Sequence, residues 1–423
     1  MTQKKDCKAL IIGAGAAGLA AAEALTRAGK RCVILEARNR IGGRIWTVKG
    51  PDQSPIELGA EFIHGRPRVT WDILKRFRIK AIPVSGVRWR KGEEGLKRDS
   101  NSWGSLSKVF SRLKSTRKDR SFLDALEKMK LSPASKEMAE RFVRSYHAAD
   151  TRKISVNDLV FQQEVSGESG MQGYRIPQGY GSLIKNLAAA LPPGSIQLNQ
   201  AVREIRWSRN KVEVVTQKSR FKAERVLVTV PLGVLKYPGA FVFYPALKAK
   251  EAALKKLEMG LAARVSFFFR EPFWQKGGRK NLSGFFQLEK TAIPVWWTGL
   301  FKDSPVLTGW LGGPEVQKLG APKLFTRRGL ESLSGLFYFD QKFLKSKLLR
   351  TYFHDWSSDP FSRGAYSYCG VGGMPARKEL ARPVDKTLFF AGEATDDSGE
   401  ASTVAGAFSS GLRAAEEIIS SLI

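Results

Sequence analysis

The hydrophobic pattern near the start of the chain predicts a strand, a helix and a second strand. Residues 9–13 (ALIIG) form a short apolar run that ends in glycine, and residues 32–37 (CVILEA) form another. Between them lies the alanine-rich stretch 19–30, which is ended by Gly29. Two buried runs joined by a helix are typical of a βαβ unit with parallel strands. We therefore expect an α/β fold.

The pattern changes to amphipathic helices after residue 66. Apolar residues recur at helical spacing in the stretches 71–77, 105–114, 121–129 and 136–146, with a strand-like interruption at 82–91. This spacing gathers the apolar side chains on one face of each helix. We therefore expect a mainly helical second region here.

Strands return after residue 196. The stretches 196–216 and 225–235 alternate between apolar and polar residues, and unusually aromatic runs follow at 264–274, 283–289 and 306–314. The last fifty residues hold an apolar strand at 387–393, a polar loop and a helix from about 403 to 421. Because the chain ends on the elements with which it began, we expect two interleaved domains.

Composition and length narrow the class of protein. The chain has 423 residues, of which 43% are hydrophobic and 26% charged, as in ordinary globular proteins. No stretch reaches the roughly 18 apolar residues of a membrane span, and no signal peptide is recognised. The three cysteines, at 7, 32 and 369, and the three histidines are too scattered for a metal site. We expect a cytoplasmic protein without a metal.

The formal net charge is +30, and it is unevenly distributed. Residues 66–153 hold 24 Lys or Arg against 10 Asp or Glu. Such an excess is compatible with a nucleic-acid partner. The charges are nevertheless interspersed with polar and apolar residues, which favours the solvated faces of helices. We therefore regard nucleic-acid binding as the less favoured interpretation.

A glycine motif follows the first predicted strand. Gly13, Gly15 and Gly18 form GxGxxG, and Glu36 ends the next strand. In this context the glycines allow a tight turn, admit a pyrophosphate and let helix and strand pack, while the carboxylate binds the ribose hydroxyls. The free N–H groups of the helix favour the phosphate. The motif predicts a Rossmann-like dinucleotide site and leaves NAD and FAD open.

The next residues favour FAD. Gly42 and Gly43 would let a second loop approach the pyrophosphate, and Arg38 and Arg44 could bind it through charge-assisted hydrogen bonds. Nicotinamide enzymes do not usually need this second clamp. We expect an FAD-binding domain made of 1–80, 196–258 and 366–423, and an α+β substrate domain made of 81–195 and 259–365.

Several motifs together resemble one family. They are LEARNRIGGRI at 35–45, IELGAEFIHG at 56–65, WSSDPFSRGAYSY at 356–368, the closing stretch 388–415 and, more loosely, VREIRW, VLVTVPLGVL and REPFW. The chain looks like the flavin-dependent amine oxidases, which include monoamine oxidases, polyamine oxidases and histone-lysine demethylases. The resemblance extends from residue 9 to residue 415.

The resemblance implies which residues bind FAD. Those expected at the adenosine and pyrophosphate are Gly13, Gly15, Gly18, Glu36, Arg38, Gly43 and Arg44, with Val202 meeting the adenine through its backbone. Those expected at the ribityl chain and ring are Ala60, Glu61, Glu393 and Val404. The last of these begins a helix, whose N-terminus would stabilise negative charge on the reduced ring.

The resemblance also implies a substrate site. Trp356 and Tyr366 match the aromatic wall beside the flavin, and Glu61 and His64 match a segment whose acidic groups attract a cationic amine. Thr403 stands where monoamine oxidases have a second tyrosine. Arg264 stands where many members have a lysine that holds a water near flavin N5, which leaves reactivity with oxygen open.

These features imply an FAD-dependent oxidation of a small amine. A hydride equivalent would pass to flavin N5, the imine would be hydrolysed, and oxygen or another acceptor would reoxidise the flavin, oxygen giving hydrogen peroxide. Two alternatives remain. One is a related flavin desaturase or oxidase acting on a non-amine, and the other is a flavin-bearing binding protein that uses its basic surface. The oligomeric state is not specified.

The residue at 365 leads to a prediction about FAD attachment. Ala365 stands where monoamine oxidases carry the flavin-bound cysteine, so that site offers no sulfur for a thioether. We predict that acid precipitation releases all FAD into the supernatant, as measured by its absorbance. Flavin retained in the washed pellet would contradict this.

Overall fold

The βαβ unit expected from residues 9–37 is present as β1 (Cys7–Ile12), α1 (Ala16–Arg27) and β2 (Cys32–Leu35) in a computed structural model of the chain. β1 and β2 pair in parallel. The structure describes residues 7–84, 87–92, 95–100, 102–167, 170, 172–275, 282–321 and 323–422.

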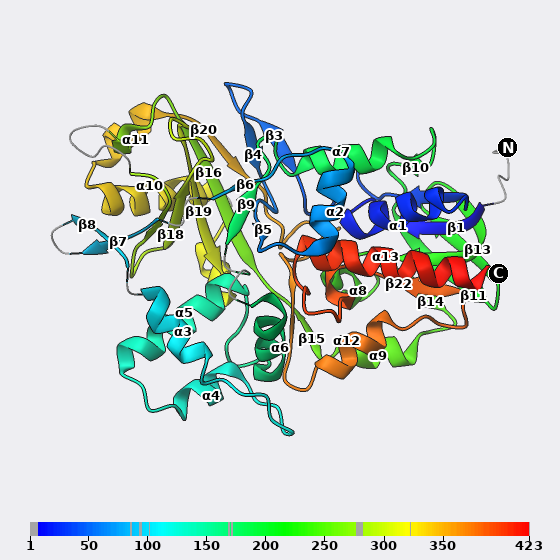
Figure 1. The fold of residues 1–423 in the computed structure, drawn as a ribbon. Coiled ribbons are helices and arrows are strands. Elements are labelled where there is room, and N and C mark those ends of the chain that lie inside the picture. Colours follow the sequence, from blue (N-terminus) through cyan, green and yellow to red (C-terminus); the bar gives the residue numbers. More distant parts are fainter. Residues whose placement is uncertain are drawn as a thin grey trace.

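This unit belongs to a large sheet in one half of the molecule, on the right in Figure 1. The strand order is β10-β2-β1-β13-β12-β11-β14, and β22 pairs with β13. The added strands are β10 (Ile196–Gln197), β11 (Val202–Ser208), β12 (Lys211–Thr216), β13 (Arg220–Val228), β14 (Val242–Tyr244) and β22 (Leu388–Phe390). β1 is parallel to its neighbours, whereas β11, β12 and β13 form an antiparallel meander.

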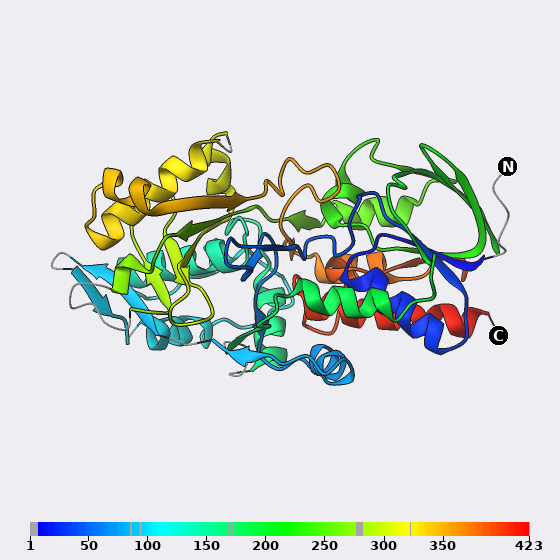
Figure 2. The same cartoon turned by 90° about the horizontal axis from the view of Figure 1, so that it is seen from above.

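Helices from distant parts of the chain share one apolar core with α1. They are α2 (Arg68–Arg76), α7 (Gly181–Ala189) and α13 (Val404–Ser421), and Figure 2 shows α1 and α13 side by side. Gly411 permits this approach, since a Cβ there would lie 2.3 Å from the Ala17 carbonyl oxygen. The core contains Leu183 and Leu187 of α7. α7 therefore packs with this half, although its residues precede position 196, where the second FAD-binding segment is expected to begin.

The remaining elements of this half lie near β22 and the cavity described below. They are α8 (Leu232–Lys236), α9 (Lys248–Leu254), α12 (Met374–Ala381), η4 (Glu393–Thr395) and the pair β15 (Leu257–Met259) and β21 (Ser367–Cys369). Leu257, Cys369 and Leu380 share a small buried cluster.

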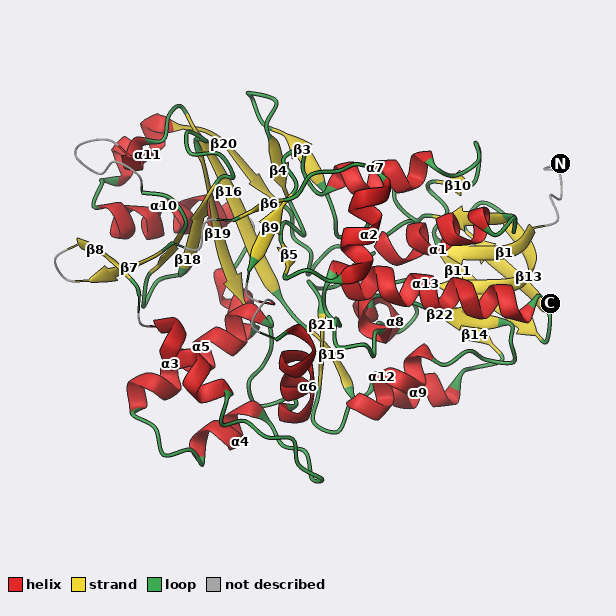
Figure 3. Ribbon diagram, viewed as in Figure 1, coloured by secondary structure: helices red, strands yellow, loops and turns green. Residues whose placement is uncertain are grey.

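The other half contains a second, mainly antiparallel sheet, at the left of Figure 3. Its order is β20-β16-β19-β18-β17-β7-β8, and only β17 and β7 are parallel among these pairs. The strands are β7 (Arg88–Gly92), β8 (Gly95–Arg98), β16 (Ala262–Phe269), β17 (Phe285–Gln287), β18 (Val295–Thr298), β19 (Val306–Gly312) and β20 (Leu348–Phe353). Its aromatic core includes side chains from η2 (Phe273–Gln275), α10 (Lys323–Phe337) and α11 (Gln341–Lys347), near η3 (Pro314–Leu319).

The expected helical region is also present in this half. It consists of α3 (Ser102–Phe110), α4 (Phe122–Glu127), α5 (Pro133–Tyr146) and α6 (Val156–Ser166), which share their own core. Two small sheets lie between the halves: β3 (Thr47–Lys49) with β4 (Pro55–Glu57), and β5 (Ile63–His64) with β9 (Gly173–Arg175) and β6 (Ile82–Pro83). Within the described ranges, none of the helices has the length and apolar character needed to cross a membrane.

A buried ion pair joins the helical region to the other half. Arg377 of α12 donates to both carboxylate oxygens of Asp158 on α6, at 2.5 and 3.0 Å. The two residues are 3% and 0% exposed. Loss of one partner leaves a buried charge without compensation, which is strongly destabilising.

We therefore predict that Asp158→Ala lowers the free energy of unfolding by about 3–5 kcal/mol. The exposed pair Arg327–Glu331 provides a matched control, and Glu331→Ala should cost less than about 1 kcal/mol. Chemical denaturation of the FAD-loaded protein measures both. Equal stability of the two variants would contradict this role for Asp158.

Candidate active site

A cavity of about 1580 Å³ runs between the two halves of the molecule. All the site residues that the sequence predicts line it, except Gly18. They are Gly13, Gly15, Glu36, Arg38, Gly43, Arg44, Ala60, Glu61, His64, Val202, Arg264, Trp356, Tyr366, Glu393, Thr403 and Val404. Residues from both ends of the chain, such as Gly15 and Glu393, therefore face the same space.

The glycine loop forms one end of this cavity. Gly18 packs away from it, and a Cβ there would lie 2.0 Å from the Gly13 carbonyl oxygen. At Gly15 a Cβ would meet nothing within 4 Å. Gly15 is the N-cap of α1, and across this fully described helix no side chain caps the N-terminus and no acidic residue lies in the first turn. The free N–H groups thus face open space that suits an anion.

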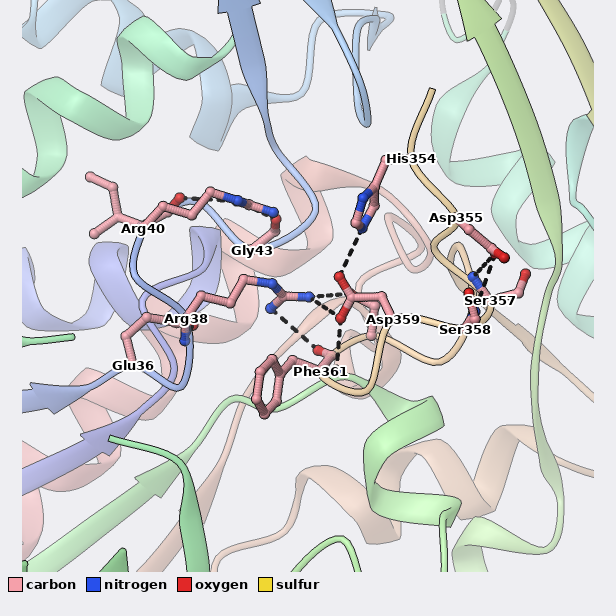
Figure 4. Close-up of polar contacts among 12 residues, drawn as sticks. Glu36, Arg38, Arg40, Gly43, His354, Asp355, Ser357, Ser358, Asp359 and Phe361 are labelled. Atoms are coloured by element: carbon pink, nitrogen blue, oxygen red, sulfur yellow. Dashed lines mark hydrogen bonds and ion pairs between the residues drawn. The ribbon is translucent and has the colours of Figure 1, made fainter. Parts of the chain in front are cut away.

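Glu36 and Arg38 directly follow β2, and Figure 4 shows the Arg38 side chain pointing toward Asp359. Glu36 is 4% exposed and accepts hydrogen bonds from the Ala14 and Arg38 amides, at 2.7 and 2.8 Å. The Arg38 guanidinium is directed at Asp359, 2.7 Å away, rather than free to clamp a phosphate. Burial opposes ionisation of Asp359, but hydrogen bonds from His354 and Arg38 hold its pKa below the usual range. Asp359 therefore fixes Arg38 at the cavity wall.

Arg44 meets the C-terminal motif. Its guanidinium donates to the Glu393 carboxylate at 2.8 Å and to the Ala365 carbonyl at 2.7 Å. The Ser367 hydroxyl also donates to Glu393, at 2.5 Å. The contact joins segments that lie 349 residues apart in the sequence. It brings both ends of the chain to one point on the cavity.

Glu61 and Arg264 form a buried charge cluster with Arg175. The Glu61 carboxylate lies 2.5 Å from a guanidinium nitrogen of Arg264 and 2.8 Å from one of Arg175. Trp297 also donates to it, at 3.1 Å. Burial would raise the pKa of Glu61, but the charges of Arg175 and Arg264 hold it below its ordinary value.

This cluster corrects one expectation. Glu61 was expected to attract a cationic amine, whereas its charge is already compensated by two arginines. Arg264 is 8% exposed, so it is a buried residue of β16 whose guanidinium is held by Glu61 and by the Gly59 carbonyl at 3.2 Å. Arg175 had no motif to single it out, since it lies 114 positions from Glu61 in a short strand.

The aromatic residues predicted at the substrate site are fixed by hydrogen bonds. Trp356 donates to the Leu58 carbonyl at 2.8 Å. The Tyr366 hydroxyl donates to the Tyr146 carbonyl at 2.8 Å, and its ring lies nearly parallel to that of Trp310, at 7° and 6.5 Å between centroids. All four of these aromatic residues line the cavity. They form the walls of an apolar chamber next to the charge cluster.

His64 belongs to this chamber as a neutral group. Its Nδ1 lies 3.3 Å from the Tyr146 hydroxyl, and the two rings meet edge to face. Burial lowers the pKa of His64 to about 4 and raises that of Tyr146 to about 12. The His64 imidazole is therefore uncharged at neutral pH and can exchange a hydrogen bond with Tyr146.

The N-terminus of α13 faces the cavity through Thr403 and Val404. The Thr403 hydroxyl caps the helix by accepting from the Gly406 amide at 3.1 Å. The first amides of the helix point their positive dipole into the cavity. Thr403 thus acts as a helix cap here, and it adds no aromatic surface to the chamber.

The cavity suits FAD by its own features. It is long enough to connect an uncapped glycine-rich helix N-terminus, a buried ribose-binding carboxylate and an aromatic chamber, which match the phosphate, sugar and ring parts of a flavin dinucleotide.

Sequence reasoning missed Arg175, Trp297, Tyr146, Asp359 and Glu400. Asp359 and Glu400 lie inside motifs that the sequence had already singled out. Their charged side chains within those motifs were the signal that could have identified them.

Comparison with known proteins agrees with this geometry. The family model of flavin containing amine oxidoreductases matches residues 16–419. Polyamine oxidase 3 of Oryza sativa subsp. japonica is 31% identical over 97% of this chain and 88% of its own length. Lysine-specific histone demethylase 1 homolog 2 of Arabidopsis thaliana is 31% identical over 97% of this chain, which spans 58% of that relative.

Solved structures show the same fold. Wild-type putrescine oxidase bound to putrescine superposes with a TM-score of 0.84 at 19% identity, covering 98% of this chain and 99% of that one. Cyclohexylamine oxidase from Brevibacterium oxydans IH-35A gives 0.83 at 20% identity, covering 99% of both chains. The predicted α/β fold, with a parallel-rich sheet and a mixed second sheet, is thus confirmed. On the extent of the family match, this chain belongs to the flavin containing amine oxidoreductases.

Proposed function

We propose that the protein oxidises the C–N bond of a small amine with non-covalently bound FAD. The observation that carries this proposal is the joint lining of one cavity by the glycine loop, the α13 N-terminus and the aromatic chamber. FAD, when bound, takes a hydride equivalent from the carbon next to the amine nitrogen and passes the electrons to an acceptor, for which we propose oxygen.

The residues of this chain would supply binding and electrostatics. Gly15 and the first turn of α1 would bind the pyrophosphate, Glu36 the ribose, and the Val404 amide the ring, where the helix dipole favours negative charge. Ala60 and Val202 offer backbone groups along the same path. No side-chain nucleophile is needed, so the work of the protein is placement of the amine and exclusion of water.

The aromatic chamber would orient the substrate. Tyr366 and Trp356 are held by backbone carbonyls, so their rings keep a fixed position. Such walls bind the apolar body of an amine and can interact with its nitrogen. Because His64 is neutral at neutral pH, it carries no positive charge that would repel the amine.

Anaerobic reduction of the bound flavin tests this proposal. We predict that at least one member of a panel of monoamines, polyamines and amino acids bleaches the visible absorbance of the flavin, and that air restores it with release of hydrogen peroxide. A non-amine oxidase would be reduced only by other donors. A panel in which no amine reduces the flavin would contradict the proposal.

Arg264 should matter most when the flavin is reoxidised. Arg264 would place a fixed cation beside the bound ring, where it would stabilise negative charge, and oxygen reduction needs a well-placed positive group. We predict that Arg264→Met slows reoxidation by oxygen about tenfold or more, and slows reduction by amine less. Arg264→Lys keeps a cation beside Glu61 and should retain the oxygen step.

Stopped-flow traces of the two half-reactions measure these effects. Unchanged reoxidation in Arg264→Met would mean that Arg264 serves only as the structural partner of Glu61.

A further inference from the structure

Glu400 is a cavity-lining carboxylate without a cation beside it. It precedes α13 and is one of six acidic residues that line the cavity. Over the ranges that the structure describes, its carboxylate has neither a hydrogen bond nor an ion pair. Burial, and then the charge of Asp396, raise its pKa above the ordinary value. Burying this charge without a partner costs free energy, and a cationic ligand bound beside Glu400 would offset that cost.

The other acidic residues of the cavity already have partners. Glu36 is bound by backbone amides, Glu393 by Arg44 and Glu61 by two arginines. Glu289 forms an ion pair with Arg141 at 3.1 Å, and Asp99 lies close enough to Arg88 to stabilise its charge. Glu400 is therefore the remaining carboxylate available to a cation among the described residues that face this space.

The backbone holds Glu400 in a fixed position. Its amide donates to an Asp396 carboxylate oxygen at 2.9 Å, and its carbonyl accepts from the Thr403 hydroxyl at 2.6 Å. A Cβ at Gly406 would lie 2.2 Å from that carbonyl oxygen, so helix α13 packs directly on it. The side chain therefore projects from a rigid loop, as a recognition group should.

Glu400 lines the same cavity as the aromatic residues Tyr146 and Tyr366. Its charge contributes, after burial, to the raised pKa of Tyr146. The Tyr146 carbonyl in turn binds the hydroxyl of Tyr366, and the Tyr146 hydroxyl contacts His64. The free carboxylate and the aromatic walls thus belong to the same part of the cavity.

We propose that Glu400 binds the ammonium group of the substrate and accepts one of its protons before the hydride leaves the neighbouring carbon, and that the substrate is a monoamine with an apolar or aromatic body. The proposal rests on the amine oxidation proposed above. One available carboxylate compensates one ammonium group. A second ammonium, as in a diamine, would find the carboxylates of Glu61, Glu289 and Glu393 already paired with arginines.

Amine binding to the FAD-loaded protein tests this assignment. Butylamine and 1,4-diaminobutane have the same carbon chain and differ by one ammonium group, and 2-phenylethylamine adds an aromatic body. Their dissociation constants are obtained anaerobically from the perturbation of the flavin spectrum, or from the amine dependence of flavin reduction. We expect butylamine and 2-phenylethylamine to bind more tightly than the diamine.

Glu400→Gln removes the charge while keeping the shape of the side chain. It should weaken butylamine binding about tenfold or more, because a charge-assisted hydrogen bond is lost, and leave the FAD content unchanged. Asp397→Asn is the matched control, since Asp397 is exposed on the same loop and does not line the cavity. It should change binding less than about twofold.

The outcomes separate this inference from the proposed function. Equal butylamine binding by Glu400→Gln and the wild type overturns the role of Glu400, whether or not amines reduce the flavin. Tighter binding of the diamine than of butylamine overturns the monoamine assignment, as does the absence of any amine binding. Amines that bind through Glu400 but do not reduce the flavin would leave this inference standing and contradict the proposed oxidation.

Discussion

The cavity depends on one buried carboxylate that ties together three distant segments. Glu393 accepts from Arg44 in the second glycine loop and from Ser367 at the start of β21, and it precedes the last helix. It is 5% exposed, so its charge needs these partners. Because the partners come from separate parts of the sequence, the cofactor path can form only when the chain has closed on itself.

A second buried cluster decides what the cavity can recognise. Arg175 and Arg264 compensate Glu61, so this carboxylate cannot also serve a substrate ammonium. The same cluster places a fixed positive group at the chamber, beside the aromatic wall that includes Trp297. This cluster has two arginines for one carboxylate, and under our proposal the substrate ammonium is bound by Glu400 instead.

The sequence predicted the fold well where the signal was local. The apolar run, the glycine turn and Glu36 identified the βαβ unit, and helical spacing identified α3, α4 and α5, whereas α6 was not singled out. The sequence did not place α7 in the segment expected to begin at 196, because only the packing of this helix on α1 associates it with the first half. Periodicity reports that a helix has an apolar face but does not report which core that face joins.

The sequence predicted which residues line the cavity better than it predicted which of them form ion pairs. Motif residues such as Gly15, Arg44 and Val404 do line one cavity. The pairing of Arg38 with Asp359, and of Glu61 with Arg175, could not be read from spacing, since the partners lie 321 and 114 positions apart. Ion pairs between distant segments depend on tertiary packing, and these pairs determine which charges remain available to a ligand.

A crystal structure of the protein with its bound cofactor would test the central claim most directly. The account predicts FAD in the cavity between the two halves, with its pyrophosphate at the N-terminus of α1, its ribose at Glu36 and its ring between the α13 N-terminus and Tyr366. A flavin bound elsewhere, or a cavity in which Glu36 and the α1 N-terminus remain without ligand, would contradict it.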